Sequence, residues 1–241
     1  MLKALYEVIQ DDAHARTLSI DGRQYTTKPV VAVHDPKPET LVVSTLTGMV
    51  DYLKANVDKL DVAALLCHVE SPAQVVLYSG LTGKFYDRPA YLKAELRQLQ
   101  IKLNTYIDGE SFNILLQSCF CEPDDGLQAT DRGLVLKYIA NIKNTSEIGV
   151  KDDGVSQGVT VKTGIASVGN AVLPNPVTLR PYRTFTEVEQ PASRFVFRCK
   201  HDDDGMKYML AEADGGAWRG EAMRNVKEYL VTMVPGLNVI A

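Results

Sequence analysis

Cysteine is scarce in this chain of 241 residues, which has four, and so are tryptophan, with one, and long uninterrupted apolar runs. Four cysteines spread over this length do not make a disulfide framework, which fits a reducing compartment. No stretch approaches the apolar length that crosses a bilayer, and the apolar start of the chain is interrupted by Glu7 and lacks a small-residue cleavage site. We therefore expect a cytoplasmic protein without a signal peptide or a membrane partner.

A large excess of charge is also missing. The chain has 26 lysines and arginines against 30 aspartates and glutamates, a formal net charge of -4. This balance argues against a dominant, nonspecific nucleic-acid binder, although it leaves room for a local basic face. The apolar fraction of 45% and the charged fraction of 23% are ordinary for a globular protein, and the length suffices for one large domain or two small ones.

Complete catalytic motifs are absent. Residues 79–85 (SGLTGKF) are similar to a nucleotide-binding loop, but Tyr78 stands where the first glycine is required and Phe85 where a magnesium-binding hydroxyl is required. A turn is therefore favoured there. The histidines are scattered and accompany no recognisable nucleophile elbow: His14, His34, His68 and His201. We predict no catalytic residues and no cofactor, and we do not expect an enzyme.

Candidate metal ligands do not form a known pattern either. Cys119-Phe120-Cys121 places two soft ligands together, but a structural zinc site requires four, and no second close pair follows. The acidic clusters lack the alternating oxygen ligands of a calcium loop and lie beside a glycine or proline, which is typical of solvated turns: Asp124-Asp125, Asp152-Asp153 and Asp202-Asp203-Asp204. We predict no metal site.

The pattern of a metal-dependent nuclease is incomplete in this sequence. Its pattern needs a first carboxylate and then an acid two residues before a lysine on a strand. Asp124 can start this pattern, but Thr160 stands where the second acid is required before Lys162. A metal-dependent hydrolase using Asp124, Asp152 or Asp202 remains an alternative only because acids far apart in sequence can converge in space.

Strand patterns at both ends and helix patterns in the middle predict an α+β fold, with a mixed or antiparallel sheet and helices packed on it. Residues 1–38 are expected to form an appendage with a helix over Leu2–Ile9 and a β-hairpin over Thr17–Thr26, whose Asp21-Gly22 suits a two-residue turn. A strand over Val30–Val33 follows, before the proline-rich residues 35–38. Residues 39–241 are expected to form the body.

The C-terminal part, residues 177–241, has the clearest pattern. Apolar residues alternate with basic ones over Ser193–Lys200, which predicts a half-buried strand. The turn ending in Gly205 predicts an antiparallel return over Met206–Ala213. From Ala217 the apolar residues recur every three or four positions, which predicts a helix on a sheet, anchored by Trp218 and stopped by Pro235-Gly236.

The sequence predicts a mixture of short strands and amphipathic helices in the middle of the body. Strands are predicted over Leu41–Val43, Val62–Val69 and Gln74–Tyr78, with β-like character from Asp152 to Gly169. Helices are predicted from Thr45 or Thr47 to Leu60, over Tyr91–Tyr106, over Phe112–Phe120 after a capping Ser111, and from Thr130 or Asp131 to Ile142.

Basic and aromatic residues gather on two strands that we expect to be neighbours. They are Arg180, Tyr182, Arg183, Phe185, Arg194, Arg198 and Lys200. A sheet face that mixes arginine with aromatic rings can stack bases and neutralise phosphates. The same composition is typical of an edge strand protected by charge or of an oligomer interface. A nucleic-acid partner is not favoured, because the rest of the chain is acidic.

Three segments resemble an uncharacterised family of temperate-phage and prophage proteins: residues 41–53 (LVVSTLTGMVDYL), 106–116 (YIDGESFNILL) and 174–197, which includes PYRTF. The likeness spans most of Leu41–Leu230 and leaves out residues 1–38. It implies a phage-encoded protein of the host cytoplasm, in a family often encoded near early recombination or DNA-metabolism genes. It carries no established catalytic residues.

These observations predict a non-enzymatic phage or prophage protein that forms a homo-oligomer or binds another protein. Subunit contacts are expected at the hairpin over Thr17–Thr26 and at the charged strand over Arg194–Lys200. One alternative is a single-stranded nucleic-acid-binding accessory of phage recombination or replication. The other is the metal-dependent hydrolase described above.

Overall fold

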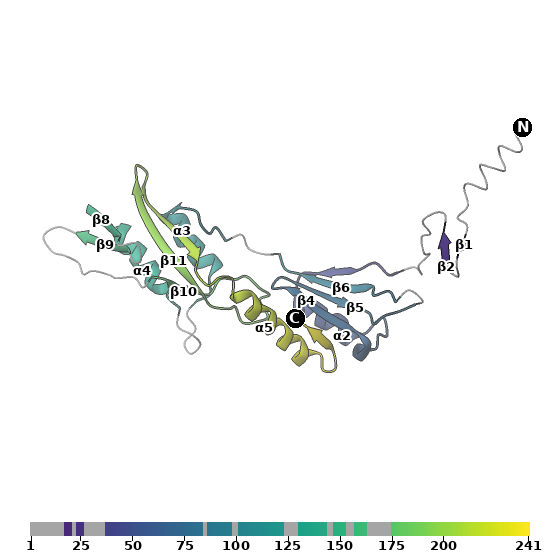
Figure 1. Ribbon diagram of the computed structural model, residues 1–241. Helices are drawn as coiled ribbons and strands as arrows, with labels where there is room; N and C mark the ends of the chain where they lie inside the picture. Colours follow the sequence, from purple (N-terminus) through teal and green to yellow (C-terminus); the bar gives the residue numbers. More distant parts are fainter. Residues whose placement is uncertain are drawn as a thin grey trace, which may run out of the picture. The chain divides into compact units, whose positions relative to one another are not determined.

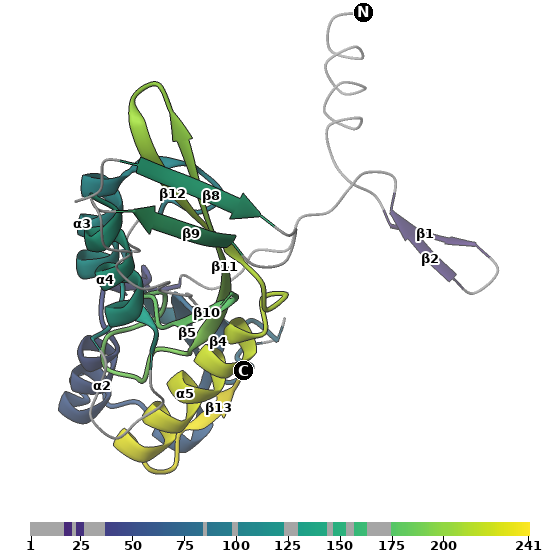
Figure 2. The ribbon, with the colours of Figure 1, turned by 90° about the vertical axis from the view of Figure 1, so that its left-hand side faces the viewer.

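The computed structural model describes residues 17–20, 23–26, 37–83, 86–97, 101–122, 130–143, 147–152, 157–162 and 175–241. The chain divides into two units, one of residues 1–37 with 83–87 and one of residues 38–82 with 88–241 (Figure 1). In the first unit, β1 (Thr17–Ile20) and β2 (Arg23–Thr26) form an antiparallel hairpin with Ile20 opposite Arg23 (Figure 2). This confirms the predicted hairpin; the helix over Leu2–Ile9 and the strand over Val30–Val33 lie outside the described residues.

The second unit confirms the α+β class and contains a mixed sheet of five strands. Its order is β13-β4-β5-β6-β3, in which β3 runs parallel to β6, β13 runs parallel to β4, and the other pairs are antiparallel. The strands are β3 (Leu41–Val43), β4 (Leu66–Ser71), β5 (Gln74–Tyr78), β6 (Ala90–Glu95) and β13 (Asn238–Ile240).

Two helices, α2 (Leu46–Ala55) and α5 (Trp218–Met233), pack on one face of this sheet. Both contribute buried apolar residues to a single core, and the sheet contributes alternate residues of its strands: Cys67, Val69, Val75, Leu77, Leu92 and Ala94. The predicted C-terminal helix is confirmed, because α5 begins at Trp218 and ends at Met233, just before Pro235-Gly236.

The helix predicted over Tyr91–Tyr106 is wrong, since β6 occupies residues 90–95. Leu92 and Ala94 are buried at a spacing of two, as in a strand, and Leu96 packs against the same core. Leu103, in contrast, packs against the core of a second sheet. The leucines are spaced as in a helix, but they belong to two different cores, and this is why the spacing predicted a helix wrongly.

The boundaries of neighbouring elements also differ from prediction. Helix α2 begins after Thr45, whose hydroxyl accepts the N–H of Gly48 at 3.0 Å, but it ends at Ala55, before Asn56 in a left-handed conformation, rather than at Leu60. The strand predicted from Val62 begins at Leu66, because Val62–Ala64 forms a short 3-10 helix, η1. The predicted strands over Leu41–Val43 and Gln74–Tyr78 are confirmed as β3 and β5.

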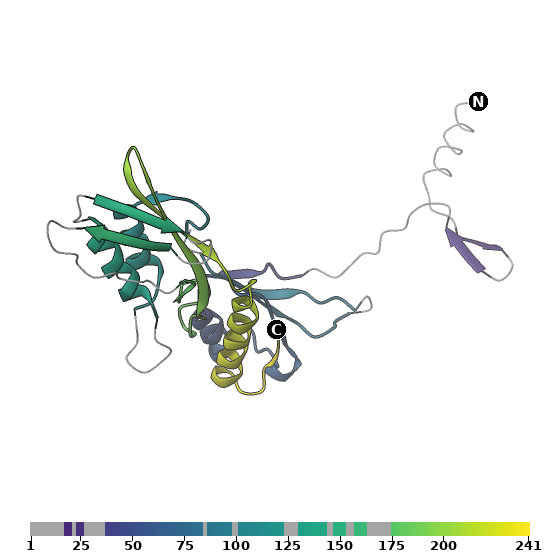
Figure 3. The same ribbon diagram turned by 60° about the vertical axis from the view of Figure 1, so that its left-hand side comes forward.

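An antiparallel sheet of four strands, β10-β11-β12-β7, carries the second core. Its strands are β7 (Ile107–Asp108), β10 (Val177–Leu179), β11 (Ser193–Asp202) and β12 (Gly205–Glu212). Strands β11 and β12 form the long hairpin drawn in light green in Figure 3, and Asp202 pairs with Gly205, which has a φ of +107°. The predicted strand, turn and antiparallel return are thus confirmed.

Helices α3 (Gly109–Cys119) and α4 (Arg132–Lys143) supply the other half of this core. Phe112 of α3 and Tyr138 of α4 both lie against Phe197, with ring centroids 5.9 and 5.7 Å apart. Helix α3 starts earlier than predicted, because Asp108 caps it in place of Ser111. A further antiparallel hairpin, β8 (Glu147–Asp152) with β9 (Gln157–Lys162), forms a sheet of its own.

The cap of α3 predicts an acid-dependent loss of stability. The Asp108 carboxylate accepts the N–H groups of Ser111 and Glu110 at 2.9 and 3.0 Å, and these bonds, Ser111 first, hold its pKa below the ordinary value. Because the pKa of this carboxyl is lower in the folded than in the unfolded protein, the cap stabilises the fold fully at pH values above the unfolded pKa of about 4. This stabilisation is lost as the pH falls through the folded-state pKa. Asp108→Ala should therefore lower the free energy of urea unfolding at pH 7, and the difference should shrink below about pH 4. A difference that is equally large at low pH would contradict this cap.

Candidate interaction sites

The basic and aromatic residues predicted to form a nucleic-acid site separate into a buried and a surface group. Arg180 and Arg183 are only 5% and 7% exposed, and Phe185 is fully buried in the core of the five-stranded sheet. Arg194 and Lys200 are exposed, and Arg198 is half-buried. Tyr182 is 37% exposed. The structure therefore does not bring all of these side chains to one surface.

Arg183 is held by aromatic rings and carboxylates. The carbon at the centre of its guanidinium lies 3.9 Å from the centroid of the Trp218 ring, and one terminal nitrogen donates to Glu212 at 2.5 Å. The other terminal nitrogen donates to the Ser193 hydroxyl, which in turn donates to Asp214 at 2.5 Å. Burial lowers the pKa of Arg183, while the two carboxylates oppose this shift. The guanidinium thus links the start of β11, the end of β12 and the start of α5.

Arg180 is similarly engaged with protein groups. Its Nε donates to the backbone oxygen of Gln190 at 3.0 Å, and a terminal nitrogen lies 3.1 Å from Glu189. The Gln190 side chain accepts the backbone N–H groups of Arg183 and Thr184 at 3.0 and 3.2 Å. Residues 180–190 are therefore ordered by buried polar contacts, and Arg180 and Arg183 serve this segment rather than presenting charge to solvent.

The surface group lies on one face of β11. Arg194, Arg198 and Lys200 alternate with the buried residues of the strand, so they lie on the face opposite helices α3 and α4. The Lys200 ammonium is 4.7 Å from the centroid of the Tyr106 ring. A sheet face with these groups can contact phosphates and stack an aromatic ring on a base.

Lys207 belongs to the same face and was missed by the sequence reasoning. It pairs in register with Lys200, and its ammonium contacts Asp202 at 3.1 Å and Asp204 at 3.2 Å. The hydrogen bond from Lys207 holds the pKa of Asp202 below its ordinary value. A two-residue turn between Asp202 and Gly205 sets the register of the hairpin, so the sequence of this turn already implied that Lys200 and Lys207 are opposite each other. The acids of this turn therefore partly neutralise the basic face.

The remaining candidate metal and catalytic residues do not converge in the described part of the chain. Among those residues, no group of three or more histidines, cysteines, aspartates or glutamates is placed to hold a metal ion. Asp152 lies at the end of β8, whereas Asp124, Asp125 and Asp153 lie outside the described residues. Cys119 is buried, Cys121 is half-buried, and neither forms a disulfide. Residues 79–83 follow β5, and Lys84 and Phe85 lie outside the described residues.

A second surface, the outer edge of β3, was not predicted as a site. β3 ends the five-stranded sheet, and none of the described strands pairs with its outer side. Leu41 and Val42 are 52% and 66% exposed, and the strand contains no charged residue. Only the strand order shows that β3 is at an edge, so the apolar triplet by itself could not have identified this surface.

Two hollows lie beside this edge. One of about 230 Å³ is near Leu41 and is lined also by Pro38, Glu39, Tyr52, Asp58, Leu60 and Tyr91. One of about 540 Å³ is near Val43 and is lined also by Val42, Ser44, Thr45, Gly48, Glu95 and Arg97. Burial and a 2.7 Å hydrogen bond to Asp58 raise the pKa of Tyr52 to about 12. A hollow therefore lies near each end of the edge strand.

Comparisons with family models, with curated proteins and with solved structures found no match to this chain. No helix of the described residues is long and apolar enough to span a bilayer.

Because Arg183 is buried and Arg219 is exposed beside the same ring, we expect their replacement by alanine to lower the free energy of unfolding by very different amounts. Arg183→Ala should lower the free energy of unfolding by about 3 kcal/mol, because it removes one partner of a mostly buried ion pair and empties the space beside Trp218. Arg219 provides the control, since it is exposed and lies 5.0 Å from the same ring; Arg219→Ala should cost less than about 1 kcal/mol. Urea unfolding of both variants measures the difference, and equal losses would contradict the role given to Arg183.

Proposed function

We propose that this is a phage or prophage protein of the host cytoplasm that acts without catalysis, by associating with its own copies or with another protein. The phage origin rests on the resemblance of residues 41–53, 106–116 and 174–197. The observation that carries the association is the apolar edge formed by β3, with Leu41 and Val42 exposed and with no described strand paired to its outer side.

The chemistry of an edge strand favours this proposal. The outer side of such a strand presents backbone N–H and C=O groups, and proteins usually protect it with charged residues or proline. β3 has neither within Leu41–Val43. A strand from a partner can add to such an edge through main-chain hydrogen bonds, while neighbouring pockets receive alternate side chains. The hollows near the two ends of β3 can receive such side chains.

Val42→Lys tests the edge directly. A lysine in the middle of an exposed edge strand disfavours strand addition without disturbing the buried core, so the variant should have a lower native mass than the wild-type protein in light scattering behind a sizing column. Val57→Lys is the matched control, because Val57 is 70% exposed and lies outside every strand, and it should leave the native mass unchanged. A wild-type protein that is monomeric at all concentrations would contradict the proposed self-association.

A second candidate function is the binding of single-stranded nucleic acid on the outer face of β11. It is supported by the alternation of Arg194, Arg198 and Lys200 on that face and by the closeness of Lys200 to the Tyr106 ring. It ranks below association because Asp202 and Asp204 compensate Lys207 on the same face, and because the chain is acidic.

Charge reversal on the exposed part of this face separates the two functions. The double variant Arg194→Glu and Lys200→Glu should weaken binding of a single-stranded DNA at low salt by at least about tenfold if the face binds phosphates, with a reduced salt dependence. The double variant Arg224→Glu and Lys227→Glu makes the same change in charge at two exposed sites on α5 and should have little effect. Fluorescence anisotropy measures the affinity, and the absence of binding by the wild-type protein at low salt would remove this candidate.

A further inference from the structure

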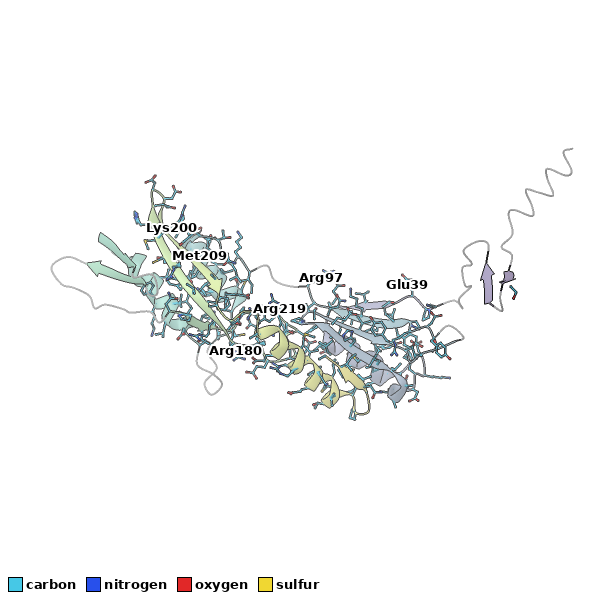
Figure 4. All side chains as sticks on the ribbon, viewed as in Figure 1. Glu39, Arg97, Arg180, Lys200, Met209 and Arg219 are labelled. Carbon is cyan, nitrogen blue, oxygen red and sulfur yellow. The ribbon has the colours of Figure 1, made fainter. Side chains whose placement is uncertain are left out.

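The two ends of the β3 edge carry opposite charges. Glu39 lies exposed before the strand, and Arg97 lies exposed in the hollow beyond its other end (Figure 4). Neither has an ion-pair partner among the described residues, whereas the neighbouring acids are engaged: Asp58 accepts from Tyr52, and Glu95 pairs with Lys93 at 3.0 Å. The edge therefore has a free carboxylate at one end, an apolar middle, and a free guanidinium at the other end.

This order of groups is self-complementary when the strand meets a reversed copy of itself. Antiparallel pairing centred on Val42 places Leu41 opposite Val43 of the second copy, and Thr40 opposite Ser44. Apolar residues then meet apolar residues, and the acidic end of each strand lies beside the basic end of the other. Parallel pairing in the same register would instead place Glu39 beside Glu39, and like charges directly opposite each other are unfavourable.

We infer that the protein dimerises through β3, with a second copy of this chain added antiparallel about a two-fold axis at Val42, and with Arg97 of each copy facing Glu39 of the other. The dimer has one continuous sheet with five strands from each copy. This inference rests on the association proposed above and specifies the partner and its orientation.

The topology of the sheet distinguishes the β3 to β3 contact from the other edge-to-edge contact, in which β13 of one copy pairs with β3 of the next. Following the pairings across the sheet, β13 and β3 run in the same direction at the two edges. Joining β13 of one copy to β3 of the next, with the helices on the same face of the joined sheet, would therefore form a parallel pair and a head-to-tail chain that closes only as a ring. The β3 to β3 contact closes after two copies and forms an antiparallel ladder, which is slightly more stable per residue.

A cysteine at the proposed axis tests the contact. Opposite residues of an antiparallel pair have Cα atoms about 4.5 to 5.5 Å apart, within the range for a disulfide. Oxidised Val42→Cys should therefore run as a covalent dimer on a non-reducing gel. Val57→Cys is the control and should remain a single chain, as should the wild-type protein, whose cysteines are buried except for the half-buried Cys121.

A charge swap tests the orientation without touching the core. Arg97→Glu and Glu39→Arg should each weaken the dimer by about tenfold in analytical ultracentrifugation, because each creates two like-charge contacts across the axis. The double variant should recover most of the wild-type affinity, because it restores opposite charges. Both residues are exposed, so all three variants are expected to fold; thermal melts confirm this.

The outcomes distinguish this inference from the broader proposal. A dimer that Val42→Lys disrupts, but that Val42→Cys does not link and the double charge swap does not restore, would overturn the two-fold arrangement and leave association through β3 standing. Species that keep growing with concentration would favour head-to-tail pairing and likewise overturn it. A wild-type protein that is monomeric at all concentrations would overturn the two-fold arrangement together with the proposed self-association, and would leave only binding to another protein.

Discussion

The buried contact between Arg183 and the Trp218 ring is the interaction on which the arrangement of the larger unit depends. A guanidinium removed from water has to be paired and hydrogen-bonded, because an unpaired buried charge is strongly destabilising. Glu212, Ser193 and Trp218 meet this requirement, and they come from β12, β11 and α5. One guanidinium thereby joins the start of β11 and the end of β12 to the first residue of α5.

The segment around Arg183 connects the two hydrophobic cores. Val177 and Leu179 are buried in the core of the four-stranded sheet, while Phe185 is buried in that of the five-stranded sheet. Between them, the Thr184 hydroxyl donates to the Pro72 carbonyl in the turn between β4 and β5 at 2.6 Å. The PYRTF segment, read from the sequence as a possible contact with phosphates, mainly serves the interior of the protein.

The surfaces left for partners lie on different sheets. The apolar edge of β3 belongs to the five-stranded sheet, and the basic face of β11 belongs to the four-stranded sheet. Their chemistry also differs, since one offers backbone groups and aliphatic side chains and the other offers ammonium and guanidinium groups. A substitution on one surface can therefore be interpreted without assuming an effect on the other.

Local features were determined by the sequence itself. The hairpins over Thr17–Thr26 and Ser193–Glu212, and the helix that starts at Trp218, were predictable because turn residues and apolar spacing act within a few positions. The tertiary structure decided the rest. Residues 90–95 form a strand, and the leucines that follow pack into two different cores. Arg183 is buried beside Glu212, which lies 29 positions away in the sequence. The strand order places β3 at an edge of its sheet. Burial and edge position depend on contacts between distant segments, which local spacing does not encode.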